Sequence, residues 1–149
     1  MAEEPAGQER QGYEMVVERG KIREFALATM THNPEYLDDP VAVSPPTFLQ
    51  TAAFWAPEGA TSPSGMLDMN LARVLHGGQE FVFFGPPPRA GTKLTTESRV
   101  DKVYEKEGRR GGTMKFAETV TSFFDESGNL VAESRATIIE TGKAPTEEV

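Results

Sequence analysis

The chain has 149 residues, 38% of them hydrophobic and 26% charged, and it contains no cysteine. This length predicts one domain with a core of its own, and the lack of thiols excludes disulfides, thiolate metal sites and a cysteine nucleophile. The net charge of −8, from 15 basic and 23 acidic residues, disfavours a general nucleic-acid-binding protein. Two histidines cannot form a multi-histidine metal cluster within one chain.

Both ends of the chain lack a hydrophobic pattern. Residues 1–11 and 142–149 carry charge, glycine and proline, and they predict flexible tails around a single domain over residues 12–141. The first residues show neither the basic nor the apolar segment of a secretory signal. No apolar run approaches the roughly 20 residues of a membrane-spanning helix. We therefore expect a cytoplasmic protein without a membrane span.

The first part of the domain predicts a strand and a helix. Residues 13–17 alternate as in a short strand. From Gly20 the apolar side chains recur at helical spacing, which predicts an amphipathic helix to about Thr29. Asn33-Pro34 is expected to end this helix, because the residue before proline is pushed out of the helical conformation.

The next predicted helix is the most apolar segment of the chain. Ser44 is its expected N-cap and Pro45 its first residue. Residues 48–56 are apolar nearly all round, which is typical of a buried helix. The large apolar residues of this helix form the core, the wall of a pocket, or both: Phe48, Leu49, Phe54 and Trp55.

The second half of the chain predicts four strands, over residues 79–84, 93–106, 114–124 and 130–139. Hairpin loops are expected at residues 108–112 and 125–129. Helices followed by an antiparallel meander make an α+β fold. Only a sheet wrapped around the apolar helix would cover all of its faces.

A curled antiparallel sheet around one hydrophobic helix resembles the hot-dog fold. Three segments resemble the MaoC-like (R)-specific enoyl-CoA hydratase and 3-hydroxyacyl dehydratase family: KIREFA with NPEY at residues 21–26 and 33–36, SPPTF at residues 44–48, and LHGGQEFV with PRAGTKL at residues 75–82 and 88–94. The last is similar to the N-terminal-type, fatty-acid-synthase dehydratase-like branch, which includes HadA-like subunits and accessory chains of steroid side-chain enoyl-CoA hydratases. The likeness spans about residues 13–141.

The resemblance departs from the family at the catalytic motif. Active members carry Asp-x-Asn-Pro-x-His, whose carboxylate and imidazole orient a water for syn addition across an enoyl thioester. Aligned on Asn33-Pro34, this chain has Thr31 and Tyr36 at those two positions. Threonine is not a carboxylate base, and tyrosine titrates near pH 10. We therefore expect no catalytic dyad; His32, one residue away, either replaces the histidine after a register shift or lies exposed at the helix end.

The resemblance implies an accessory, substrate-accommodating subunit of a heteromeric enoyl-thioester hydratase or 3-hydroxyacyl dehydratase, a lyase of lipid or steroid metabolism. Hot-dog chains resemble one another in pairing side by side, so the expected partner is a MaoC-like chain with the intact dyad, or a second copy of this chain. No cofactor and no metal are expected. The substrate-binding candidates are Pro46, Thr47, Phe48, Leu49, His76 and Gly77, where His76 either lines an acyl pocket or has a structural role.

Other interpretations remain open. Arg109 and Arg110 either contact CoA phosphates, which suit guanidinium geometry, or form a solvated hairpin tip. The carboxylates at residues 38 and 39 either act as a pair or belong to a turn. The chain is alternatively a homomeric hydratase or thioesterase that uses His76 or Glu118, or a non-enzymatic acyl-CoA-binding module. Its acidity favours CoA over an acidic carrier protein.

Overall fold

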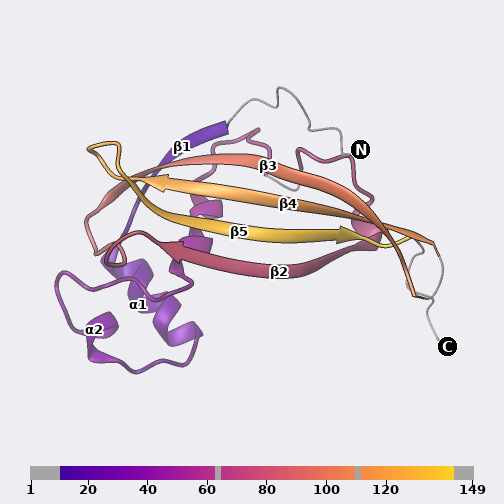
Figure 1. Ribbon diagram of the computed structural model, residues 1–149. Coiled ribbons are helices and arrows are strands. Elements are labelled where there is room, and N and C mark those ends of the chain that lie inside the picture. The colour runs from indigo at the N-terminus through magenta and orange to yellow at the C-terminus, as the bar shows by residue number, and fades with distance from the viewer. Residues whose placement is uncertain (1–10, 63–64, 110–111, 143–149) are drawn as a thin grey trace.

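The computed structural model describes residues 11–62, 65–109 and 112–142. One five-stranded antiparallel sheet has the strand order β1-β3-β4-β5-β2 (Figure 1). The elements in chain order are β1 (Gln11–Val16), α1 (Arg19–Ala28), α2 (Pro34–Leu37), the 3₁₀ helices η1 (Phe48–Trp55) and η2 (Leu71–Arg73), β2 (Val74–Phe83), β3 (Lys93–Glu107), β4 (Thr113–Phe124) and β5 (Leu130–Glu140). The predicted α+β plan and the β3–β4–β5 meander are confirmed.

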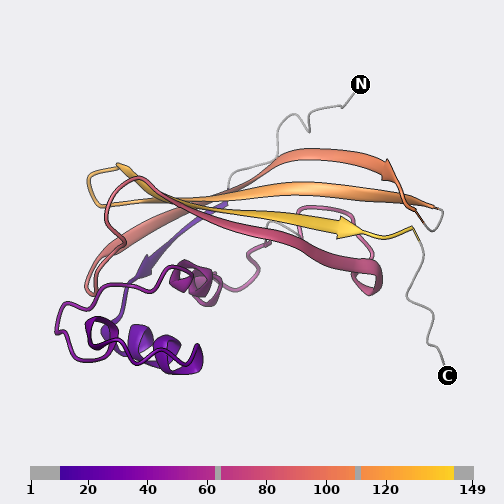
Figure 2. The same cartoon turned by 60° about the horizontal axis from the view of Figure 1, so that its bottom comes forward.

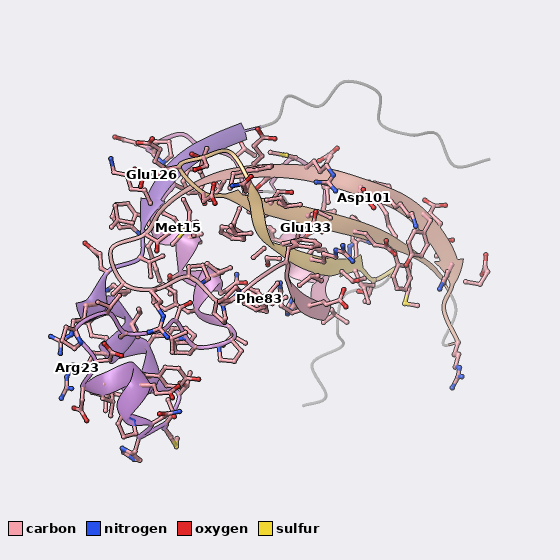
Figure 3. All side chains as sticks on the ribbon, turned by 60° about the vertical axis from the view of Figure 1, so that its left-hand side comes forward. Met15, Arg23, Phe83, Asp101, Glu126 and Glu133 are labelled. Carbon is pink, nitrogen blue, oxygen red and sulfur yellow. The ribbon has the colours of Figure 1, made fainter. Side chains whose placement is uncertain are left out.

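The helical elements α1, α2 and η1 lie at one end of the curled sheet, on its concave side (Figure 2). The core fills the space between them and the strands, and Figure 3 labels Met15 of β1 at this end and Asp101 of β3 farther along the sheet. The members of the core are apolar side chains from β1, α1, η1 and the adjoining strands: Met15, Val17, Ile22, Ala42, Phe48, Leu49, Ala52, Leu94, Phe123 and Ala132. The far half of the concave face has no α-helix over it.

The sequence pattern predicts helix α1, but it does not predict the short helix α2 that comes after it. Ile22 and Ala26, four residues apart, are its buried side chains and face the core, while Arg23 points outward (Figure 3). Asn33 does not end α1, which stops at Ala28. The Asn33 side chain instead accepts a hydrogen bond from the Glu35 backbone N–H at 3.0 Å and caps the short helix α2.

The prediction of a fully buried helix opened by Ser44 and Pro45 is wrong. The element is a 3₁₀ helix with i→i+3 hydrogen bonds and begins at Phe48, after Thr47. Ser44 lies before it, and its buried hydroxyl caps nothing. Phe48 is 1% exposed and Phe54 is 84% exposed, so this helix has one buried side and one open side.

The two strands that flank β4 and β5 each contain one extra residue at the same level. In β3 the pairing shifts between Val100 and Lys102, opposite Glu118 of β4. In β2 it shifts between His76 and Gly78, opposite Thr137 of β5. Glu118 and Thr137 are themselves paired, so the bulges lie on one line across the sheet. Such bulges bend the strand and increase its twist, which adds to the curl of the sheet.

The predicted tails lie mostly outside the described residues. Residues 1–10 and 143–149 of the predicted tails, and Arg110 of the predicted phosphate site, are not among the described residues. No helix in the described ranges is both long enough and apolar enough to cross a membrane.

Candidate functional site

A cavity of about 700 Å³ lies between η1 and the concave face of the sheet. Its volume is within the range of small-molecule pockets. The floor comes from alternate residues of adjacent strands, because alternate side chains of a strand share a face: Ser98, Thr119, Thr121, Phe123, Ser134, Ala136 and Ile138 from β3, β4 and β5. On the helical side it is bounded by residues of η1 and by Phe25 of α1.

The β2 bulge places two polar side chains of β2 in this cavity. His76 and Gln79 both line it although they are three residues apart, a spacing that would put them on opposite faces of a regular strand. The extra residue, Gly77, restores the match with β5, so that His76 pairs with Ile138 and Gln79 with Ala136.

A short hydrogen-bond chain links these two side chains to β5. The Gln79 side-chain amide donates to the Ser134 hydroxyl at 2.7 Å, and its oxygen lies 3.2 Å from Nε2 of His76. Since the Gln79 oxygen only accepts, the proton of this contact belongs to Nε2. In neutral His76 the other ring nitrogen, Nδ1, is then a free acceptor.

Hydroxyl groups cross the floor in a row. Ser98, Thr121 and Ser134 occupy paired positions on β3, β4 and β5, and the hydroxyls of Ser98 and Thr121 are 2.9 Å apart. Thr119, one step further along β4, is 5% exposed and faces the same cavity. The floor is therefore polar in its centre and apolar on either side of it.

The helical wall is fixed to the sheet by Tyr13. Its hydroxyl donates to the Ala52 carbonyl of η1 at 3.0 Å. Burial raises the pKa of Tyr13 above its ordinary value, the hydrogen bond with Thr96 being a smaller opposing effect. The phenol therefore stays protonated and keeps this donor at neutral pH.

Three of the predicted substrate-binding residues line the cavity: Thr47, Leu49 and His76. Leu49 also belongs to the core. The other three do not line it. Phe48 lies in the core, where its ring meets that of Phe25 edge to face with 5.7 Å between the ring centroids. Pro46 and Gly77 are exposed. Gln79, Ser134 and Thr119 line the cavity as well and do not stand out in the sequence pattern. The double glycine within β2 is the signal that a bulge changes which residues share a face.

The positions aligned with the family's dyad lie away from this cavity. Thr31 follows α1 and Tyr36 is in α2, packed against the core, and neither lines the cavity. His32 is exposed. Among the described residues that line the cavity there is no aspartate or glutamate.

The other carboxylates weighed from the sequence have structural surroundings. Asp39 accepts the Val41 backbone N–H at 2.8 Å, as in a turn. Glu118 accepts a hydrogen bond from the Tyr104 hydroxyl at 3.2 Å. It follows Ala117 and precedes Thr119 on β4, so it projects from the convex face.

Arg109 lies exposed at the turn between β3 and β4. In the described part of the chain, no group of three or more His, Cys, Asp or Glu side chains is placed to hold a metal ion.

Sequence comparison relates the chain to the FAS1-like dehydratase domain region and to UPF0336 proteins. The family model of the FAS1-like dehydratase domain region matches residues 5–134. A UPF0336 protein of Streptomyces coelicolor is 36% identical over 100 residues, which cover 62% of this chain and 65% of that protein, just under two thirds of its length. A UPF0336 protein of Saccharopolyspora erythraea is 31% identical over 140 residues, 89% of this chain and 85% of that protein.

Solved structures with the same fold are more distant in sequence. The HadBC (3R-hydroxyacyl-ACP dehydratase) complex of Mycobacterium tuberculosis matches with a TM-score of 0.67 at 24% identity, covering 87% of this chain and 92% of that one. The ChsH1–ChsH2 complex of the same organism gives 0.70 at 16% identity, with 92% and 86% covered. A MaoC-like dehydratase of Phytophthora capsici gives 0.67 at 21% identity, with 93% and 48% covered.

The curled five-stranded sheet with its helix confirms the predicted hot-dog fold, and the family match confirms the resemblance drawn from the sequence motifs. The chain belongs to the FAS1-like dehydratase family and has the hot-dog fold of the MaoC-like dehydratases.

Proposed function

We propose that this chain is the accessory, substrate-accommodating subunit of a heteromeric enoyl-thioester hydratase or 3-hydroxyacyl dehydratase. A MaoC-like partner would supply the aspartate and histidine of the reaction. The observation that carries the proposal is a roomy cavity whose described lining includes a histidine but no carboxylate. Hydration needs groups that give and take protons within hydrogen-bond reach of the reacting atoms, whereas holding an acyl group needs only shape and a few polar contacts.

Two structural neighbours support a heteromeric assembly. The HadBC dehydratase and the ChsH1–ChsH2 pair are both complexes of two different chains. The chain described here matches 92% and 86% of the respective neighbouring chains, so it has the size of one subunit of such a pair.

The open edge of the sheet supports a partner as well. β2 is one of the two edge strands, the other being the shorter β1, and it pairs only with β5 within the described chain. Six consecutive residues of β2, numbers 75–80, are exposed. A long exposed edge strand readily pairs with another strand, and Leu75 of β2 and Leu71 of η2 add exposed apolar surface beside it.

The test is a comparison of this chain alone with this chain co-expressed with a MaoC-like chain that has an intact Asp-x-Asn-Pro-x-His motif. Hydration of crotonyl-CoA and of longer 2-enoyl-CoA esters should stay at background for this chain alone. The heteromer should be about 10²–10⁴-fold faster, the usual contribution of a positioned proton-transfer group. Substituting the partner's aspartate or histidine should abolish the rate, while Thr31→Ala in this chain should leave it unchanged.

The position of His76 favours a second candidate, a homomeric hydratase or thioesterase. When the ring is neutral, its Nδ1 is an acceptor without a hydrogen-bond donor among the described residues, and His76 is the one histidine among the described lining residues. Turnover by this chain alone that is lost in His76→Ala would establish that activity and refute the accessory role. Light scattering distinguishes the two candidate functions as well. The accessory role predicts a discrete heteromer with the MaoC-like chain, and the absence of a complex with every MaoC-like chain tested would contradict that role.

A further inference from the structure

We propose that the cavity selects an acyl group that carries an uncharged oxygen, a hydroxyl or a keto group, on the part remote from the thioester. The inference rests on the proposed function and names the class of acyl group that this subunit accommodates. The remote position follows from the division of labour: the reacting carbons would lie at the partner's dyad, and the rest of the acyl group would extend over the floor of this cavity.

The floor offers hydrogen bonds where a plain alkyl chain would need apolar surface. Ser98, Thr121 and Ser134 lie on three adjacent strands, whose spacing of about 4.8 Å sets them in a row. The Ser134 hydroxyl accepts from Gln79 at 2.7 Å and still carries its own O–H. Covering such groups with methylenes would remove their hydration without replacing it.

Thr119 provides a second, independent observation. The residue is 5% exposed and lines the cavity, and its hydroxyl makes no hydrogen bond with another described residue. The hydroxyl oxygen is not among the fully buried unpartnered atoms, so it is reached from the cavity and can donate or accept one hydrogen bond there. An oxygen of the bound acyl group would be its partner.

The lining also sets the charge of that oxygen. No lysine, arginine, aspartate or glutamate is among the described residues of the cavity wall. A carboxylate or an ammonium group would therefore enter without a counter-charge, which is costly. Neutral hydroxyls, amides and the His76 ring match a hydroxyl or a carbonyl. Phe81 and Ile138 border them and suit the adjoining hydrocarbon.

The experiment uses matched CoA esters, so that the contribution of the CoA moiety cancels. Dodecanoyl-CoA and its derivatives with a hydroxyl group at carbon 6, 9 or 12, or with a keto group at carbon 6 or 9, are titrated into the purified chain by calorimetry. The described cavity wall comes from this chain itself, so binding should not need the partner. At least one oxygenated derivative should bind about tenfold more tightly than dodecanoyl-CoA, as one net hydrogen bond allows.

Two substitutions locate the effect, and a third is the control. Thr119→Val keeps the side-chain shape and removes the Thr119 hydroxyl, and Ser134→Ala removes the Ser134 hydroxyl. Each substitution should reduce the preference for the oxygenated ester. Thr51→Val is the control for removing a hydroxyl from an almost buried threonine, because Thr51 of η1 is 6% exposed and does not line the cavity. It should leave the preference unchanged.

The outcomes separate this inference from the function on which it rests. Equal or tighter binding of dodecanoyl-CoA, with no effect of Thr119→Val and Ser134→Ala, would overturn the oxygen preference and leave the acyl-accommodating role intact. Binding of none of the esters would overturn both.

Discussion

Replacing Phe48 with alanine should lower the free energy of unfolding by about 3–5 kcal/mol, the usual cost of removing a buried ring. Phe48 is 1% exposed and lies in the core. Its ring also meets that of Phe25 edge to face at 5.7 Å and 82°, a geometry worth about 0.5–1.5 kcal/mol beyond the buried area. We therefore expect a loss in the upper half of that range.

Urea denaturation followed by tryptophan fluorescence measures this loss directly. The chain has one tryptophan, Trp55, which packs against the core at the end of the same helix. In a domain of this size each kcal/mol lowers the melting temperature by about 2–4 °C. The variant should therefore melt roughly 8–20 °C below the parent protein at equal concentration.

Phe54→Ala is the matched control, since it removes the same ring from the same helix. Phe54 is 84% exposed, so its loss should change the free energy of unfolding by less than about 0.5 kcal/mol. Equal losses for the two variants would refute the one-sided burial of η1 and would mean that another surface covers Phe54. A loss below about 1 kcal/mol for Phe48→Ala would contradict the placement of the Phe48 ring in the core.

Four further predictions concern the cavity and its surroundings. Leu49→Ala should shift kcat/KM among acyl lengths in the heteromer by about 1–3 kcal/mol per mismatched methylene, and an unchanged length profile would assign Leu49 to packing alone. Gly77→Val should cost about 0.5–1.5 kcal/mol in urea denaturation, the cost of moving one side chain off its rotamer, because a Cβ there would lie 2.6 Å from the end of the Ile139 side chain; an unaltered midpoint would contradict this crowding. Backbone and side-chain hydrogen bonds from Asn129 lower the pKa of Asp125, so its stabilising contribution should be present above about pH 4 and fade as the pH falls through the lowered pKa; Asp125→Ala should remove that part of the acid dependence of stability. Arg109→Ala should weaken binding of CoA esters and not of the matching pantetheine esters, as calorimetry would show, if its guanidinium meets the CoA phosphates.

The strands β3, β4 and β5 were predictable because no glycine or proline interrupts these long stretches. They begin and end within one residue of the expected positions. β2 begins five residues before the expected strand, since Gly77 and Gly78 have low strand propensity, and the pairing of residues 74–76 and of Gly78 with β5 decides the outcome. Local pattern fails where a tertiary partner determines the conformation.

The helix over the sheet shows a different limit. The apolar composition of residues 48–56 predicted burial, but composition does not tell how far the sheet extends beneath a helix. Phe54 lies on the open side, and the chain leaves 3₁₀ geometry after Trp55. Of the cavity, the sequence predicted Thr47, Leu49 and His76. It could not predict that the Gln79 side chain lies on the cavity face of β2, because this depends on Gly77, which has no partner on β5.

The paired bulges in β2 and β3 make the depth of the cavity sensitive to insertions and deletions of a single residue. Gly77 is supernumerary with respect to β5, so deleting it would leave His76 and Gln79 on the same face of a regular strand. Asp101 has the same relation to β4. A homologue that is one residue shorter at either point would therefore keep the side chains of the cavity floor and lose the bend. Length variation at these two positions would tune how large a bound group fits, independently of the residues that contact it.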